Sequence, residues 1–458
     1  MFGFYMQREW ADFWRSPVRI LAIAIYAGVA FWALMDGLTW QSHVQEIQAE
    51  TPADMFTDRE AWMADLRRAE AGEEVSPYSA RPMALTLRAV HMPGDLAALA
   101  HRNEAIHPHS ALISGWRSEA SLFRRYEVEG PSVLRSGRID LAFVVIVLMP
   151  LFLLMLTFDV VSRERVAGRF RVFLMQGGSL SRLLAARLLA VSVPLVLIPA
   201  ACVLIASAVK SASPVSGLIW LAAITAYALF WAGVSAMIAV LTERPASGAI
   251  AVLVSWSVFV VLIPSASQFL AQSLHPVPSR VTYLSEARDA EGQTRRNLAQ
   301  RAEIYMAEHP GQGGASDDAV PGFYRASYLA NVDINSRTAP LVAEFEDQQS
   351  AQRQFVNAVG FLSPSMMAQD LLFRASGTGP ERAAAFRQQA RAHLAVIHEA
   401  IGPATVNRSR ITVAQAEAIP EFRFAPPGHG PILWISFIWL VVAGGLLVVA
   451  TAGVARRY

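Results

Sequence analysis

Three histidines, His101, His107 and His109, form the one histidine cluster in this sequence. A His-x-His pair offers two imidazole nitrogens, which are good ligands for copper and zinc. Asparagine, proline and serine surround the cluster, and these residues are equally typical of a solvent-exposed loop. We therefore expect a solvent-exposed loop that binds no metal, and keep a metal site at these three histidines as the alternative.

Other signatures of catalysis are absent from the sequence. Lys210, the only lysine, follows no glycine-rich segment, so it cannot belong to a phosphate-binding loop that hydrolyses ATP. Cys202, the only cysteine, lies in an apolar run, which excludes internal disulfides and cysteine-based zinc sites. His398 and Glu399 lack the second histidine of an H-E-x-x-H motif, and no G-x-S-x-G occurs. We expect no enzymatic activity and no cofactor in this chain.

The segment 159–182 is the strongest candidate for an interaction site. A charged cluster and apolar positions at helical spacing follow one another there: Arg163, Glu164, Arg165, Gly168, Arg169, Phe170 and Phe173. Two consecutive glycines, 177 and 178, then interrupt the pattern. The pattern predicts a short helix that lies along the membrane with its arginines toward water or a partner. The alternative is an ordinary basic loop on the cytoplasmic side of a membrane protein.

Six apolar runs separate the polar segments, and each is long enough for a helix to cross about 30 Å of hydrocarbon. We predict membrane spans at 18–38, 139–158, 183–208, 217–241, 248–270 and 432–453. The composition, 53% hydrophobic and 17% charged, fits an all-α membrane protein with sizeable polar parts. Small residues recur within 222–250, which predicts close helix packing, for example at a subunit interface.

Two long polar segments, 39–138 and 271–429, lie between the spans. Their patterns predict helices at 53–71, 281–308, 335–358, 363–376 and from 380 to about 400, with one short strand at 83–91. The ends of both segments emerge from spans of the same chain, and no disulfide is available to staple either of them. We therefore expect them to pack into one mainly helical domain with a little β structure.

Arginines indicate how the chain is oriented. They gather in the N-terminal segment, in 159–182, at Arg244 and at the C-terminus, and six spans place all four on one face. This face should be cytoplasmic, which leaves both polar segments outside. Residues 1–17 predict an amphipathic helix at the membrane interface. Acidic residues there, and the lack of a small-residue cleavage site, argue against a signal peptide.

The order S-R-E-R-x-x-G-x-x-x-x-x-L from Ser162, then a small-residue break, an S-R pair and a span, resembles the coupling loop of bacterial ABC type-2 (exporter-type) permeases. The subgroup with large outer insertions, described as permease components for multicopper-enzyme maturation, is the most similar. The turn 242–246 and the Leu362-Ser363-Pro364 run also fit, whereas residues 40–138 fit more weakly. The family often has proline at Gly178 and threonine at Arg169, so contacts to a particular ATPase cannot be transferred.

The resemblance implies a permease subunit of a bacterial inner-membrane transporter with both termini in the cytoplasm. Two such subunits, identical or related, would enclose a path, and separate ATPase subunits that use ATP and magnesium would bind the coupling loops. An alternative keeps the fold but lets the complex transmit ATP-driven motion to its periplasmic domain, which would act on an envelope protein. The net charge of +2 gives no reason to expect nucleic acid as a partner.

Overall fold

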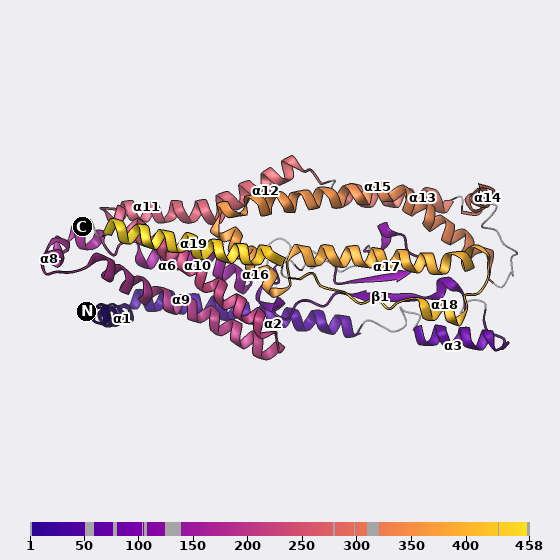
Figure 1. The fold of residues 1–458 in the computed structure, drawn as a ribbon, viewed down its shortest axis with the longest axis horizontal. Helices are drawn as coiled ribbons and strands as arrows, with labels where there is room; N and C mark the ends of the chain where they lie inside the picture. The colour runs from indigo at the N-terminus through magenta and orange to yellow at the C-terminus, as the bar shows by residue number, and fades with distance from the viewer. Residues whose placement is uncertain are drawn as a thin grey trace.

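The computed structural model describes residues 2–50, 59–76, 80–102, 104, 108–123, 139–277, 280–296, 298–308, 320–428 and 430–455. The molecule is elongated, with a bundle of apolar helices at one end and a domain of polar helices at the other (Figure 1). Both termini and helix α8 (Arg169–Met175) lie at the end of the bundle that is farthest from the polar domain.

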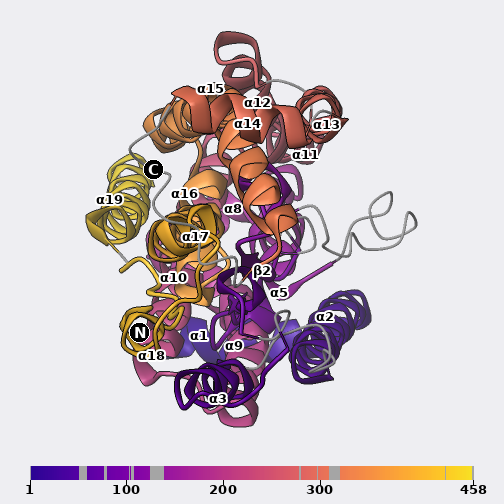
Figure 2. The ribbon, with the colours of Figure 1, turned by 90° about the vertical axis from the view of Figure 1, so that its right-hand side faces the viewer.

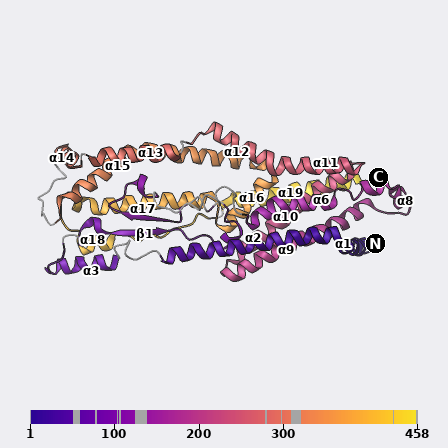
Figure 3. The same ribbon diagram turned by 180° about the vertical axis from the view of Figure 1, so that it is seen from behind.

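Six helices in the described residues are long and apolar enough to cross a membrane, which confirms the all-α membrane fold. They are α2 (Pro17–Glu50); α5 (Leu141–Phe143), η6 (Val144–Leu148) and α6 (Met149–Thr157), which form one span; α9 (Leu180–Lys210); α10 (Pro214–Leu241); α11 (Pro245–Trp256), η7 (Ser257–Leu262) and α12 (Ile263–Leu274), which form another; and α19 (Gly430–Ala455). Helix α2 continues past the predicted span toward the polar domain (Figure 3).

Two spans contain a π-helical segment that ends two residues before a proline. Pro150 follows η6 and Pro264 follows η7, and a proline supplies no N–H to the preceding turn. The freed carbonyl oxygens find other donors, as a bilayer requires. In the second span, the Tyr227 hydroxyl donates to the carbonyl oxygen of Ile146, in η6, at 2.8 Å.

The carbonyl oxygen of Phe259, in η7, accepts hydrogen bonds from the hydroxyls of Ser363 at 2.5 Å and Ser365 at 2.6 Å. Both serines lie at the start of α16 (Pro364–Ser376), where Pro364 occupies a first-turn position that needs no N–H. Gly377 ends this helix at a φ of +69°, as the sequence predicts. The short helix α16 is therefore fastened to the fifth span by the pair of serines.

The small residues of α10 pack against α19 of the same chain. A Cβ at Gly233 would meet the side chain of Leu447 at 2.7 Å, and one at Gly444 would meet the backbone of Phe230 at 2.9 Å. Such glycines let two helix backbones approach closely. The close packing predicted for 222–250 is therefore confirmed, and within the described residues it joins two helices of one chain.

The polar domain contains α3 (Arg59–Glu70), η2 (Pro82–Ala84), β1 (Thr86–Val90), η3 (Ala97–Leu99), β2 (Ser110–Ser114), η5 (Glu119–Ser121), α13 (Arg280–Arg296), α14 (Leu298–Glu308), α15 (Gly322–Val359), η9 (Gly360–Leu362), α17 (Pro380–Val406) and α18 (Val413–Ala418). Strands β1 and β2 form an antiparallel pair in which Val90 lies opposite Ser110. Helices α13 to α15 lie on one side of α17, and α3 and α18 lie on the other (Figure 2).

One hydrophobic core joins the two polar segments. Trp62, Met83 and Leu85 of the first segment pack with Phe386 and Ile397 of the second, and all five are almost fully buried. The single domain expected from the sequence is thus observed. Removing these large side chains from water is the main force that holds the two segments together, since no disulfide is possible.

Several element bounds differ from the predicted ones. The helix predicted at 335–358 begins thirteen residues earlier, at Gly322, because Tyr324 packs in the domain core and Leu329 packs in a smaller cluster with Val406 of α17. Strand β2 was not predicted, since a five-residue strand depends on its partner β1. Part of the helix predicted at 53–71 lies outside the described residues, and its described part begins at Arg59.

Candidate functional site

The loop 159–182 consists of two short helices at the end of the bundle. Helix α7 (Ser162–Val166) is followed by Gly168, which has a φ of +72°, and α8 begins immediately after it. A left-handed conformation favours glycine, because a Cβ there is strained. Nothing lies within 4 Å of the position that a Cβ on Gly168 would occupy, so the glycine is required by the bend and not by contact.

The inner side of this loop is anchored to the bundle. Phe170 is only 9% exposed and packs with Leu180, Leu184 and residues of α10 and α19. The guanidinium of Arg165 lies 5.2 Å from the centre of the Phe170 ring and donates to the carbonyl oxygen of Val240 at 3.3 Å. Two of the predicted interaction residues therefore hold the loop in place, while the others lie nearer its surface.

Glu164 fixes the arginine next to the bend. Its carboxylate accepts two hydrogen bonds from Arg169, at 2.8 Å from Nε and 3.0 Å from Nη2. Arg163 pairs with Asp159 at 3.5 Å, yet about two thirds of its side chain remains exposed, as does that of Arg169. The only acidic residue of the α7–α8 segment thus orients one arginine and leaves the net charge of the face positive.

Apolar side chains share this exposed face. Val166 is 69% exposed, Val172 is 48% exposed and Met175 is 79% exposed. We call these three residues, together with Arg163 and Arg169, the end face. Exposed apolar side chains mixed with arginines at one end of a molecule are typical of a protein-binding surface.

The N-terminal helix α1 (Phe2–Arg15) packs beside the same loop. The rings of Tyr5 and Phe173 lie 6.3 Å apart in an edge-on arrangement. Arg187 of α9 donates to Glu9 at 2.6 Å, and both side chains are nearly buried, with 11% and 12% exposed. Phe173 within the loop and Arg187 just after it are thereby both in contact with α1, so α1 holds the end face in place.

The opposite end of the bundle meets the polar domain through the described residues between β1 and β2 (91–102, 104, 108 and 109), which we call the junction loop. Gln41 of α2 donates to the carbonyl oxygen of Gly94 at 3.3 Å and accepts from the N–H of Ala98 at 3.2 Å. A Cβ at Gly37 would overlap the carbonyl oxygen of Ala98. The first span and the loop are therefore in direct backbone contact.

Other spans hold the junction loop as well. Asp140 caps the second span by accepting from Phe143 at 2.8 Å, and it also accepts from the N–H of Arg102 at 3.0 Å. Asp95 accepts from the N–H of Ser213, between α9 and α10, at 3.3 Å. The loop thus connects the polar domain to the first four spans at several independent points.

The structure separates the histidines that the sequence groups together. His101 is fully buried, its Nδ1 lies 3.2 Å from the carbonyl oxygen of Ala98 and its Nε2 lies 3.2 Å from Asp36. Its ring also stacks on Trp40 at 5.1 Å. Both ring nitrogens face oxygen atoms, so His101 fastens the loop instead of joining a ligand cluster. His107 lies outside the described residues.

His109 instead lies with two residues that sequence analysis did not select, His91 and Glu104. Their ligand atoms are all within 4.8 Å of one another. Burial raises the pKa of Glu104 to about 7, although the positive charge of Arg382 opposes this rise. No spacing rule could reveal this group, because the antiparallel register of β1 and β2 brings His91 to His109.

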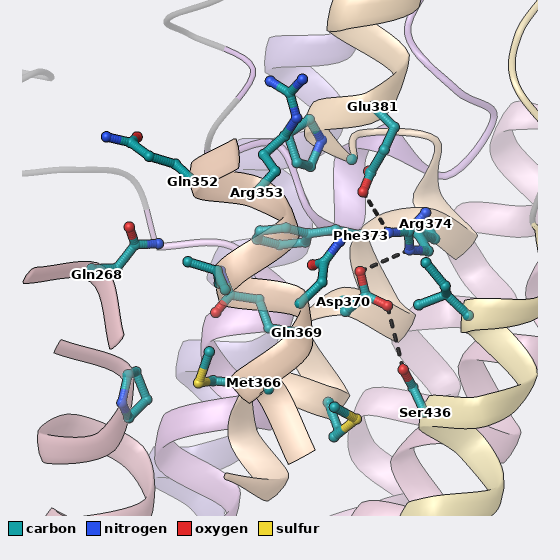
Figure 4. A pocket seen from close by; sticks show the side chains of 18 of the residues that line it. Gln268, Gln352, Arg353, Met366, Gln369, Asp370, Phe373, Arg374, Glu381 and Ser436 are labelled. Carbon is teal, nitrogen blue, oxygen red and sulfur yellow. Dashed lines mark hydrogen bonds and ion pairs between the residues drawn. The ribbon is translucent and has the colours of Figure 1, made fainter. Parts of the chain in front are cut away.

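A cleft of about 900 Å³ lies between α12 and α15 on one side and α16, α17 and α19 on the other. Its lining includes several amide side chains, among them Gln268, Gln352 and Gln369, together with apolar residues such as Phe373 (Figure 4). Arg374 donates to Asp370 at 2.7 Å and pairs with Glu381, so one guanidinium lies between two carboxylates. This lining suits the binding of a polar group, and sequence patterns gave no signal for it.

Comparison with known proteins gives one match. A family model described as a domain of unknown function (DUF3526) matches residues 280–425, which include α13 to α18 and none of the six apolar helices. No curated protein and no solved structure matches the chain. The match identifies the second polar segment as a recurring sequence unit whose function is not known.

Proposed function

We propose that this chain is the membrane-spanning subunit of an ABC type-2 transporter and that its end face binds a separate ATPase subunit. The observation that carries the proposal is the end face itself, where exposed Val172 and Met175 lie beside Arg163 and Arg169 at the end farthest from the polar domain. The resemblance of this segment to permease coupling loops supplies the identity of the partner. ATP and magnesium would be bound by that partner.

The arginine distribution supports an inner-membrane protein with the end face in the cytoplasm and the polar domain in the periplasm. Six spans and termini at the same end of the molecule agree with this arrangement. A second permease subunit is part of the proposal. The fifth span is the best candidate for that contact, since only 11% of its most apolar window is buried within this chain.

Orientation is tested by cysteine labelling in a variant whose single cysteine, Cys202, has been replaced. Cysteines at exposed Glu74 and Glu399 of the polar domain should react with a membrane-impermeant reagent in intact spheroplasts, whereas one at exposed Arg171 should react only after lysis. The labelled positions lie on the surface because the reagent cannot reach a fully buried residue such as Val320. Protection of both polar-domain cysteines would contradict the orientation.

The ATPase contact is tested by cross-linking. A photoreactive residue at Met175 should cross-link to the ABC-type ATPase encoded nearest to this chain, whereas the same residue at exposed Met92, on the junction loop, should not. Cross-linking from neither position, or from both equally, would count against the end face as the ATPase contact.

A second candidate function is the transmission of ATP-driven motion to a periplasmic protein, without a solute passing through the complex. The junction loop favours it, because backbone contacts at Gly37 and hydrogen bonds at Gln41 and Asp140 leave little room for the polar domain to move independently of the spans. In this case, fastening the junction loop to α2 by an engineered cross-link would leave activity intact, whereas deleting the polar domain would abolish it and leave ATPase binding unchanged.

A further inference from the structure

The register of the two strands places two histidines side by side where the strands end. The N–H of His91 donates to the carbonyl oxygen of His109 at 2.8 Å, which extends the ladder one pair beyond Val90 and Ser110. The two imidazole rings stack with their centres 5.9 Å apart and an angle of 11° between their planes. Both rings are thus held by backbone geometry, on the same side of the strand pair.

Glu104 brings a carboxylate to the same place from the junction loop. Its side chain is 1% exposed, and one carboxylate oxygen lies 3.8 Å from Nδ1 of His109. Neither oxygen accepts a hydrogen bond within the part of the chain that the structure describes. A buried carboxylate that accepts no hydrogen bond keeps its lone pairs available to a positively charged ligand, so this arrangement points to a cation site.

We propose that His91, Glu104 and His109 bind one divalent transition-metal ion, and that zinc is the ion that fits best. Two imidazoles and one carboxylate are a ligand set that zinc accepts, with a fourth position left for water or another group. Calcium and magnesium prefer oxygen ligands alone, so the two histidines disfavour them. The ligand atoms lie within 4.8 Å of one another, and small rotations bring them to the roughly 3.4 Å separation implied by zinc–ligand distances of about 2.1 Å.

Arg382 of α17 competes with a metal ion for His91. Its Nε–H donates to Nε2 of His91 at 2.9 Å, and its Nη2 donates to the carbonyl oxygen of Met92 at 3.0 Å. A metal ion on Nε2 of His91 displaces the first of these hydrogen bonds and leaves the second in place. The guanidinium and the metal ion therefore compete for His91, and both neutralise Glu104.

This competition links metal binding to the attachment of the polar domain. Without metal, Arg382 ties the start of α17 to the strand pair. With metal, the ion ties β1 and β2 to the junction loop through Glu104, and α17 keeps only its bond to Met92 at this point. The ion thus stiffens the junction loop, whichever of the two candidate functions the protein performs.

The test measures zinc affinity of the full-length protein in detergent, purified without a polyhistidine tag and stripped with a chelator. Competition with a chromogenic chelator gives the Kd for zinc, and the visible absorption of bound cobalt(II) reports the geometry of the ligands. We expect one zinc per chain, and a loss of at least about tenfold in affinity for Glu104→Gln and for His109→Gln. His43→Gln, at an exposed histidine of α2, is the matched control and should leave the Kd unchanged.

Arg382→Gln separates a metal site from a merely structural cluster, because it removes the competitor and no ligand. Its affinity for zinc should rise, whereas a structural role alone predicts no change. Where Glu104→Gln does not fold, His109→Gln and Arg382→Gln carry the test. The proposal is overturned if the wild-type protein binds no zinc, or if a folded ligand variant binds zinc as tightly as the His43→Gln control.

Discussion

Two glycines of one helix provide a matched test of the contact between the first span and the junction loop. Gly37 and Gly28 both lie in α2, and replacing either by alanine gives the same gain in helix propensity. A Cβ at Gly37 would overlap the carbonyl oxygen of Ala98, whereas nothing lies within 4 Å of a Cβ at Gly28. The comparison of the two variants therefore isolates the contact between the first span and the junction loop.

The expected cost follows from what the new methyl group meets. The obstacle at Gly37 is backbone of Ala98, which cannot rotate away as the end of a flexible side chain does. Overpacking of this kind costs about 1–3 kcal/mol. A value near 2 kcal/mol would raise the population of the detached junction loop roughly thirtyfold, since about 1.4 kcal/mol corresponds to tenfold.

Hydrogen exchange of the amides in 91–102 is the direct assay, with thermal unfolding of the purified protein as a second measurement. Gly37→Ala should exchange faster in this segment and unfold at a lower temperature, whereas Gly28→Ala should resemble the wild type. Exchange in α8, at the opposite end of the bundle, should be the same in both variants. Equal exchange of 91–102 in the two variants would refute the argument that the junction is a close backbone contact.

Three further predictions follow from buried polar groups. Ser363→Ala or Ser365→Ala alone should change thermal stability little, because the other serine still donates to Phe259, whereas the double variant should lose about 1–3 kcal/mol; additive losses would contradict this. Arg187→Met should cost about 3–5 kcal/mol by leaving Glu9 uncompensated, and adding Glu9→Gln should recover part of the loss, which a double-mutant cycle of thermal stability measures. Burial lowers the pKa of His398, so its contribution to stability is complete above its ordinary value and is lost as pH falls through the lowered one. His398→Gln should flatten the loss of stability below about pH 6.5, and an unchanged profile would contradict the assignment.

The spans could be predicted because membrane crossing imposes one strong constraint, a long apolar run, on each of them. Helix α16 could be predicted because Ser363-Pro364 and Gly377 mark its two ends with local chemistry. Local sequence patterns did not predict β2, because this strand forms only by pairing with β1. They also failed at the first turns of α15, which are helical because distant core residues cover one face.

The candidate sites show the same contrast between features that neighbouring residues reveal and features that depend on tertiary packing. The loop 159–182 could be selected from the sequence, since Gly168 and the arginines around it are neighbours along the chain. Which residues of this loop are buried and which are paired could not be predicted from the sequence. The burial of Phe170 and the pairing of Glu164 with Arg169 depend on tertiary packing. His91 and Glu104 were missed because strand pairing, and not spacing, brings them to His109.

The most direct test of the central claim is whether the end face couples this chain to ATP hydrolysis by its partner. Gly168→Trp and Gly72→Trp form a matched pair: both glycines have positive φ, at +72° and +80°, and open space around the new side chain. Only Gly168 belongs to the loop that carries the end face, whereas Gly72 follows α3 in the polar domain. Strain at a left-handed position is therefore similar in the two variants.

The measurement is the rate of ATP hydrolysis by the ATPase subunit reconstituted with each variant in lipid vesicles. We predict that Gly168→Trp reduces ATPase binding and abolishes stimulation by this chain, as the charge reversal Glu164→Arg should also do. Gly72→Trp should retain both. Full binding and full stimulation in Gly168→Trp and Glu164→Arg would contradict the account and leave 159–182 as an ordinary basic loop.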